Sequence, residues 1–404
     1  MRHISADYIF PVFALPIKNG IVTIDDDGTI LDVSSEHEFH DPTAKVERYE
    51  GIICPGFVNT HCHLELSYLH EQITEKAEMT GFIKQFVAKR NTFSEQDVQK
   101  AIEKAEAEMI KNGIVAVGDI SNNNSTFAQK AKGNLIYHTF VEVFSMDERK
   151  AEDVFNKGLE LINELQQLEE TLDIKLHASL VPHAPYTMSE KLLMLLNQEA
   201  MQNNSLISIH NQESETESEL FISHSGKMFD SFKAMGMDVS MIRKTGVNSL
   251  RSTLPFFKDV SKILLVHNTF TSLEDIKYIK AEAAKWKSEI YFSTCPSANL
   301  YIENALPHYP YFVDEDVHLT IGTDSLASNH HLSILDELKL ITEHYPFIDL
   351  QTLLKWATKN GADFLRLNKL GSIEKGKKPG LNLLRNVDLE NLHITEFTEV
   401  QKLI

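Results

Sequence analysis

The chain has 404 residues, of which 42% are hydrophobic and 24% are charged, and its formal net charge is −19. Such a length allows one large domain of more than ~250 residues with a small one, or two to three average domains. Nucleic acids and anionic membranes attract basic surfaces, so the acidic balance disfavours both as partners.

Cysteine usage and hydropathy indicate where the protein resides. The three cysteines, Cys54, Cys62 and Cys295, are too few for a disulfide framework and predict a reducing, cytoplasmic location. The apolar stretch 8–17 contains two prolines and is too short to span a bilayer. It predicts a strand rather than a signal sequence or an anchor.

Both ends of the chain have the pattern of short strands with tight turns. Asn19-Gly20 is one turn signal, and Asp26-Asp27-Gly28 separates two strand-like runs. Near the other end, glycines and a proline surround a strand-like run at 381–384. We expect residues 1–52 and 371–404 to pair in one small β-sandwich domain.

The middle of the chain, residues 53–370, alternates short apolar runs with helical stretches. Eight runs fit buried parallel strands: 51–54, 114–117, 135–143, 174–181, 206–209, 263–266, 290–292 and 319–321. This rhythm over about 300 residues predicts an α/β fold with a (β/α)8 TIM-like barrel. The structural alternative is an open doubly wound sheet, whose usual glycine-rich phosphate turn does not follow the first run.

The longest insert between two such runs is residues 213–257. It begins with a polar, acidic stretch and carries three glycines further on. An insert after a barrel strand lies over the active-site face and could act as a lid. A solvated surface insertion explains the same pattern equally well.

Metal-binding side chains stand where the predicted strands end. His61 and His63 are two residues apart, so on a strand they project from the same side, whereas Cys62 points the other way. Further candidates follow the later strands: His183, His210, His267 and Asp324. Three imidazoles with one carboxylate suit a hydrolytic zinc or iron centre that keeps an open position for water.

These motifs together resemble the amidohydrolase superfamily, in the branch that contains deaminases of cytosine, guanine and adenosine derivatives and the triazine hydrolases. The matching segments are Pro-Gly-Phe-Val-Asn-Thr-His-Cys-His at 55–63, His-Ala-Pro-Tyr-Thr at 183–187, His-Asn-Gln-Glu at 210–213, His267, Thr-Cys-Pro-Ser-Ala-Asn at 294–299 and Gly-Thr-Asp-Ser-Leu-Ala-Ser-Asn at 322–329. Two later segments at 357–362 and 371–377 also match, and the likeness covers about 20–385.

The resemblance implies a role for each candidate residue. The metal ligands would be His61, His63, His210 and Asp324, with Asp324 also accepting a proton from water; Glu213 would shuttle protons, His267 would contact the attacking water, and His183 and Ser328 would contact substrate. Glu65 could form a hydrogen bond to the substrate or to a ligand, or be a plain surface acid. No lysine ends the fourth strand, so we expect one divalent ion, zinc by resemblance, although iron uses similar ligands.

The predicted reaction is hydrolytic deamination of an aminated N-heterocycle, most specifically an adenine nucleoside derivative. The continuation His-Leu-Glu-Leu-Ser at 63–67 resembles aminodeoxyfutalosine deaminases. Alternatives are a guanine- or cytosine-type base deaminase, a triazine chlorohydrolase, and a catalytically inactive barrel acting as an assembly protein. Relatives also imply a homodimer.

Overall fold

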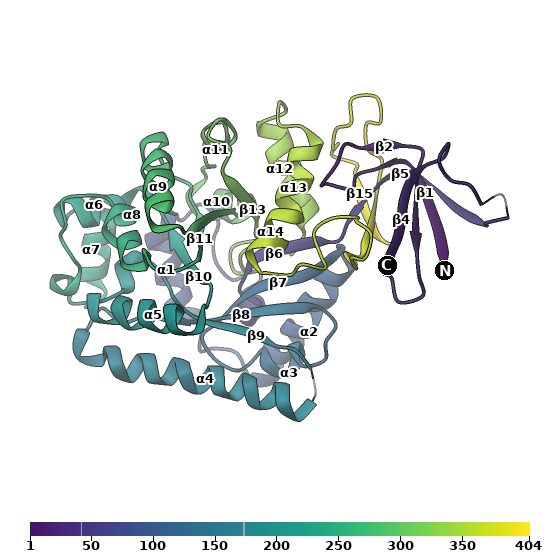
Figure 1. Cartoon of the computed structure of the whole chain (residues 1–404). Helices are drawn as coiled ribbons and strands as arrows, with labels where there is room; N and C mark the ends of the chain where they lie inside the picture. The colour runs from purple at the N-terminus through teal and green to yellow at the C-terminus, as the bar shows by residue number, and fades with distance from the viewer. Residues whose placement is uncertain (42, 173) are drawn as a thin grey trace.

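The computed structural model describes residues 1–404 apart from residues 42 and 173, and its strands form three sheets (Figure 1). One sheet lies at the end of the molecule where both termini are found. The other two are parallel sheets surrounded by helices. The fold is therefore α/β, as predicted, with a mainly antiparallel sheet added at one end.

The two chain ends share a single seven-stranded sheet in the order β15-β14-β5-β1-β3-β4, with β2 paired to β1. Its strands are β1 (Arg2–Ile9), β2 (Ile17–Lys18), β3 (Gly20–Ile24), β4 (Ile30–Ser35), β5 (Val46–Pro55), β14 (Leu381–Arg385) and β15 (Glu399–Lys402). Gly28, at a φ of 87°, lies in the predicted turn between β3 and β4. The antiparallel pairing of β14 with β5 joins the C-terminal segment to the N-terminal one.

The body of the molecule contains eight parallel strands in two sheets of four. The first sheet has the order β6 (Phe57–Cys62), β7 (Ile114–Ser121), β8 (Ile136–Val143) and β9 (His177–Pro182). The second has the order β10 (Ile207–Asn211), β11 (Lys262–His267), β12 (Glu289–Thr294) and β13 (His318–Ile321). Val58, Phe140, Val266 and Tyr291 belong to one buried apolar cluster with side chains from both sheets.

Hydrogen bonds also connect the sheets at their two borders. The amide of His210 in β10 donates to the carbonyl of His183, just after β9, at 3.0 Å. At the other border the amides of Thr323 and Asp324, after β13, both donate to the carbonyl of His61 in β6 at 3.0 Å. The two sheets therefore meet along both edges.

Helices cover the outer faces of these sheets (Figure 1). The α-helices are α1 (Glu78–Lys89), α2 (Glu95–Lys111), α3 (Phe127–Lys130), α4 (Ala151–Leu172), α5 (Glu190–Asn203), α6 (Glu215–Ser223), α7 (Lys227–Ala234), α8 (Ser249–Thr253), α9 (Leu273–Trp286), α10 (Pro296–Glu303), α11 (Tyr309–Asp314), α12 (Ile334–His344), α13 (Leu350–Ala357) and α14 (Lys359–Phe364). Short 3-10 turns are η1 (Leu64–Leu69), η2 (Glu148–Lys150), η3 (Pro185–Thr187), η4 (Val239–Met241) and η5 (Leu254–Phe257). Among the helices in this described part of the chain, none is long and apolar enough to cross a membrane.

Two strands differ from their predicted positions. The apolar run 51–54 belongs to β5 of the end sheet, and the first strand of the body is β6. The chain changes sheets at Gly56, where a side chain would meet the methyl groups of Val115, so the two backbones approach closely. The fourth strand begins at His177 rather than at 174.

The insert 213–257 is mostly helical and is packed onto the body. Phe221, Met228 and Phe232 are buried in one apolar cluster with Met79 of α1 and Tyr186 of η3. The insert thus buries one of its faces instead of forming a solvated loop. Its action as a mobile lid stays a prediction.

Replacing Gly51 with alanine should destabilise the joint between the chain ends. Gly51 has a φ of 122°, and an added Cβ would clash with the carbonyl oxygen of Leu384 in β14. We expect Gly51→Ala to cost about 2–4 kcal/mol, from backbone strain plus overpacking. The urea midpoint of unfolding, followed by circular dichroism, measures this cost.

Gly133→Ala is the matched control. Gly133 also has a positive φ, 69°, but among the described residues nothing lies within 4 Å of an added Cβ. It should cost only the strain, about 1–2 kcal/mol. Equal midpoints for the two variants would contradict the proposed clash.

Candidate active site at the strand ends

Four of the predicted side chains converge where β6, β10 and β13 end. The Nε2 atom of His63 lies 3.2 Å from that of His61 and 3.3 Å from that of His210. Oδ1 of Asp324 is 3.5 Å from Nε2 of both His61 and His63. Three imidazole nitrogens and one carboxylate oxygen thus point at one small volume.

The strand geometry explains this convergence. Side chains alternate along β6, so His61 points into the site while Cys62 packs into the apolar cluster beneath the helices. His63 comes directly after the strand and caps η1. Asp324 has a φ of 55°, a left-handed conformation that turns the chain sharply after β13. Backbone strain of this kind is typical of functional sites.

Burial disfavours the charged forms of His63 and His210. It lowers the pKa of His63 to about 3 and holds that of His210 well below its usual value. Burial alone would raise the pKa of Asp324, but the hydrogen bond to His61 and the neighbouring imidazoles lower it. Neutral imidazoles beside an ionised carboxylate are the protonation states that a metal ion requires.

The donor set fits one divalent cation. Nδ1 of His210 donates to the carbonyl of His183 at 2.7 Å, which directs the lone pair of Nε2 toward the other donors. The Nε2 atoms of the three histidines are otherwise crowded together without a shared proton donor. Three nitrogen ligands and one oxygen ligand match a tetrahedral zinc-type site, or an iron site with similar ligands.

Glu213 and His267 lie beside these donors. Nε2 of His267 is 3.5 Å from Oε1 of Glu213, and both side chains are buried. Nδ1 of His267 donates to Oδ1 of Asn299 in α10 at 3.0 Å. Burial raises the pKa of Glu213 well above its usual value and lowers that of His267 to about 4. Burial therefore favours the protonated form of Glu213 and the neutral form of His267.

The three remaining predicted residues have different surroundings. The ring of His183 is 4.9 Å from that of His210, at the edge of the cluster. The hydroxyl of Ser328 donates to Oδ2 of Asp324. Glu65 is buried in η1, where its carboxylate accepts the amide of Asn122 at 3.0 and 3.1 Å. Glu65 is thus not a surface acid, and it is held by the loop after β7.

Sequence reasoning missed Glu142 and Asn299. Glu142 is buried in β8, with Oε1 3.5 Å from Nδ1 of His210, and burial raises its pKa to about 7. Its signal was an acidic residue near the end of an otherwise apolar run. Asn299 closes the motif at 294–299, but its contact with His267 depends on how α10 packs.

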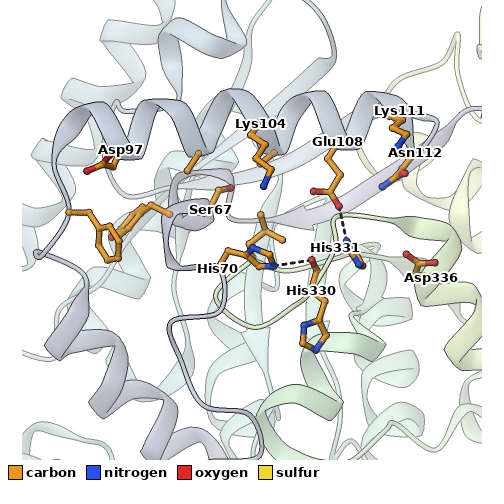
Figure 2. A pocket seen from close by; sticks show the side chains of 15 residues that line it. Ser67, His70, Asp97, Lys104, Glu108, Lys111, Asn112, His330, His331 and Asp336 are labelled. Carbon is orange, nitrogen blue, oxygen red and sulfur yellow. Dashed lines mark hydrogen bonds and ion pairs between the residues drawn. The ribbon is translucent and has the colours of Figure 1, made fainter.

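A cavity of about 840 Å³ is lined by residues of η1, of α2 and of the segment after β13 (Figure 2). Figure 2 shows α2, with Lys104 and Glu108, facing the loop that carries His330 and His331. The cavity lining contains a surface contact between His331 and Glu108 at 3.1 Å and none of the four converging donors. We therefore place the candidate active site at the donors.

Comparisons with known proteins identify the family and the fold. A sequence model described as the amidohydrolase family matches residues 52–402. An adenosine deaminase of Helicobacter pylori is 30% identical over 350 residues, which cover 85% of this chain and 81% of that protein. The solved structure of Helicobacter pylori aminofutalosine deaminase with methylthio-coformycin matches with a TM-score of 0.79 at 25% identity, covering 95% of this chain and 92% of the other.

A more distant solved structure has the same fold. An atrazine chlorohydrolase of Arthrobacter aurescens, complexed with zinc, matches with a TM-score of 0.73 at 16% identity. The match covers 98% of this chain and 90% of that one. At this identity, the likeness concerns the fold alone.

Removing one converging histidine should abolish metal loading. We expect about one equivalent of divalent ion per wild-type chain, as for a single site of four ligands, and less than about a tenth of that in His63→Ala after dialysis. Metal content per folded chain, measured by inductively coupled plasma mass spectrometry, gives the result.

His138→Ala is the matched control, because His138 is also a buried histidine but bonds Ser179 at 2.8 Å in β9. It should keep the wild-type metal content. Full loading of His63→Ala would show that the ion binds elsewhere.

Proposed function

The chain belongs to the amidohydrolase family, and from this premise we propose that it is a metal-dependent deaminase of an adenine nucleoside derivative. The observation that carries the proposal is the convergence of His61, His63, His210 and Asp324. Glu213 and His267 lie alongside them. The adenosine and aminofutalosine deaminases similar to this chain support the adenine-containing substrate. Aminodeoxyfutalosine is the specific substrate that we favour.

We propose one zinc ion as the cofactor, bound by His61, His63, His210 and Asp324. The three-nitrogen, one-oxygen donor set supports this choice. Such an ion would lower the pKa of a bound water toward ~7 and so supply hydroxide at neutral pH. Iron remains the alternative metal, because it accepts similar ligands.

The surrounding residues would supply the proton transfers. Asp324 accepts a proton from the attacking water, and neutral His267, whose Nδ1 proton goes to Asn299, orients that water by accepting a hydrogen bond at Nε2. Glu213, protonated by virtue of its burial, donates to the ring nitrogen beside the attacked carbon. A carbon–oxygen bond forms, the carbon–nitrogen bond to the amino group breaks, and protons passed on by Glu213 allow ammonia to leave.

Three further residues around the site are candidates for contact with the substrate. We propose that His183, at the edge of the cluster, contacts the nucleoside. We also propose that Glu65 and Ser328 contact the substrate. The hydroxyl of Ser328 also orients Asp324 in the present arrangement. A substrate role for Ser328 therefore requires this hydroxyl to exchange partners.

We further propose that the two parallel sheets close into a (β/α)8 barrel, residues 53–370, with residues 1–52 and 371–404 as a small β-sandwich domain. The hydrogen bonds at both borders and the shared apolar cluster support closure. The single seven-stranded sheet of the chain ends supports a separate unit. The homodimer and the cytoplasmic location stay predictions.

A substrate screen tests the reaction. We expect zinc-loaded protein to release ammonia from aminodeoxyfutalosine, and more slowly from adenosine, 5′-deoxyadenosine and 5′-methylthioadenosine. Guanine, cytosine and atrazine should give neither ammonia nor chloride. Ammonia is followed with a coupled assay and chloride with an ion-selective electrode. Turnover of guanine, cytosine or atrazine alone would overturn the proposed substrate class, and inactivity toward all of them would favour an assembly protein.

Glu213→Gln should slow the reaction without removing the ion. Because glutamine cannot transfer a proton, we expect kcat to fall by about 10²–10⁴-fold, with an unchanged metal content. Steady-state kinetics on the best substrate measure the effect. Glu215→Gln, an exposed acid two residues along, should keep wild-type activity. Equal kcat values for the two variants would exclude Glu213 as the proton carrier.

A further inference from the structure

A buried ion pair lies beneath the turn that carries His61 and His63. Nζ of Lys130 in α3 is 2.6 Å from Oδ2 of Asp119 in β7, and both side chains are fully buried. A lysine with no exposed surface is rare unless it is paired. The catalytic scheme above uses neither residue.

The surroundings of Lys130 stabilise its charge inside the protein. Its ammonium donates to the hydroxyls of Ser121 at 2.9 Å and Thr139 at 3.1 Å. It also lies 5.9 Å from the ring centre of Phe127 and 5.5 Å from that of Tyr137. Hydroxyl oxygens, a carboxylate and two aromatic rings together replace the water that a lysine loses on burial.

Asp119 connects this cation to the metal-binding turn. Its second oxygen, Oδ1, accepts the backbone amide of Leu64 at 2.8 Å. Leu64 is the residue that follows His63, and Asp119 is also paired with Cys62 across the β6–β7 ladder. The Asp119 carboxylate therefore holds the backbone after His63, and the strand pairing of Asp119 with Cys62 holds the backbone before it.

The histidines of this turn need such an anchor. Metal-binding imidazoles usually donate their second nitrogen to a neighbouring group, which sets the ring orientation. His210 does so, through the carbonyl of His183. Among the described residues, Nδ1 of His61 and Nδ1 of His63 have no hydrogen-bond partner. Their orientation must come from the backbone that carries them.

We propose that the Asp119–Lys130 pair is a positioning element that holds the His61–His63 turn in the geometry for ion binding. Lys130 fixes the position of the Asp119 carboxylate, and Asp119 holds the amide of Leu64. The inference rests on the proposed metal centre, but on neither the substrate nor the reaction. It predicts that a change at Lys130 alters the affinity for the metal, although Lys130 does not contact the ion.

The two residues should act as one unit. Lys130→Met leaves a buried carboxylate without its partner, which is strongly unfavourable. In Asp119→Asn, the NH2 group of the amide would face the ammonium of Lys130, so two donors would meet. The side chain then has to turn, and its oxygen no longer accepts the amide of Leu64. Combining the two substitutions removes this conflict, and the side-chain oxygen of the new asparagine can again accept the amide of Leu64.

A nearby buried network provides the matched control. Glu106 in α2 is 1% exposed and accepts hydrogen bonds from Tyr137 at 2.9 Å and Asn134 at 2.9 Å. Like the ion pair, this network joins buried polar groups beneath β7 and β8. Its hydrogen bonds run to β8, to the segment before β8 and to Gln129 in α3 rather than to the histidine turn, so Glu106→Gln tests for simple loss of stability.

The test measures zinc affinity directly. Metal-free wild type, Lys130→Met, Asp119→Asn, the double variant and Glu106→Gln are titrated with zinc against a chromophoric chelator, and their melting temperatures are recorded without metal. We expect the single variants to bind zinc about 10–100-fold more weakly. The double variant should recover most of this loss. Glu106→Gln should bind within twofold of wild type, whatever its melting temperature.

Three outcomes would overturn the inference. Zinc binding within twofold of wild type in both Lys130→Met and Asp119→Asn would leave the pair a purely stabilising feature. A double variant weakened by the product of the two single effects would show that the residues act independently. A wild type that binds no zinc would remove the proposed metal centre as well. If Lys130→Met does not fold, Asp119→Asn and the double variant retain the test.

Discussion

The shared carbonyl of His61 is the constraint on which the site depends. The amides of Thr323 and Asp324 both donate to it at 3.0 Å, at the border where β13 meets β6. One oxygen that accepts two successive amides forces a sharp turn, which the φ of 55° at Asp324 accommodates. The carboxylate is thereby directed toward the Nε2 atom of the same His61. The last strand of the body thus delivers its ligand next to that of the first.

The opposite border is built on the same principle. There the carbonyl of His183 accepts both the amide and Nδ1 of His210. In both places a single carbonyl replaces the regular ladder, and a donor side chain turns inward beside it. Regular pairing would have used these groups within the sheet. The chemistry is therefore placed where the two sheets join, because the backbone there is held without being fully paired.

Burial of these polar groups costs free energy when the chain folds. The imidazoles of His61, His63 and His210 crowd their lone pairs together beside the carboxylate of Asp324, away from water. The crowding of the three Nε2 atoms opposes folding, since these polar atoms lose hydration on burial. The apolar cluster between the two sheets offsets the cost. A cation at this point would relieve it, so metal binding and stability should be coupled.

The sequence predicted the features that local pattern determines and missed those that depend on packing. The alternation of side chains places His61 and His63 on one side, and His210 and Asp324 stand where their strands end. These positions could be predicted because each signal lies within a few residues of sequence. The sheet change at Gly56 was not visible, since 51–54 reads as a buried strand in either sheet. The burial of Lys130 was not visible either. A lysine in a short helical segment is normally exposed, and only the tertiary position of Asp119 changes this.

Strand ends and loops have different roles in this site. The strand ends carry the proposed reacting groups, and the loops carry residues that can select the substrate. The groups that we propose to transfer protons and bind the metal stand at or just after strand ends, where hydrogen bonds leave little freedom of movement. Phe144, just after β8, is 48% exposed, and its ring lies 5.7 Å from that of His183. An exposed aromatic ring beside the reaction site offers a surface for the part of a nucleoside away from the attacked carbon. Proteins with the same donors can therefore differ in substrate through such loop residues, while the bond that is cleaved is set by the strands.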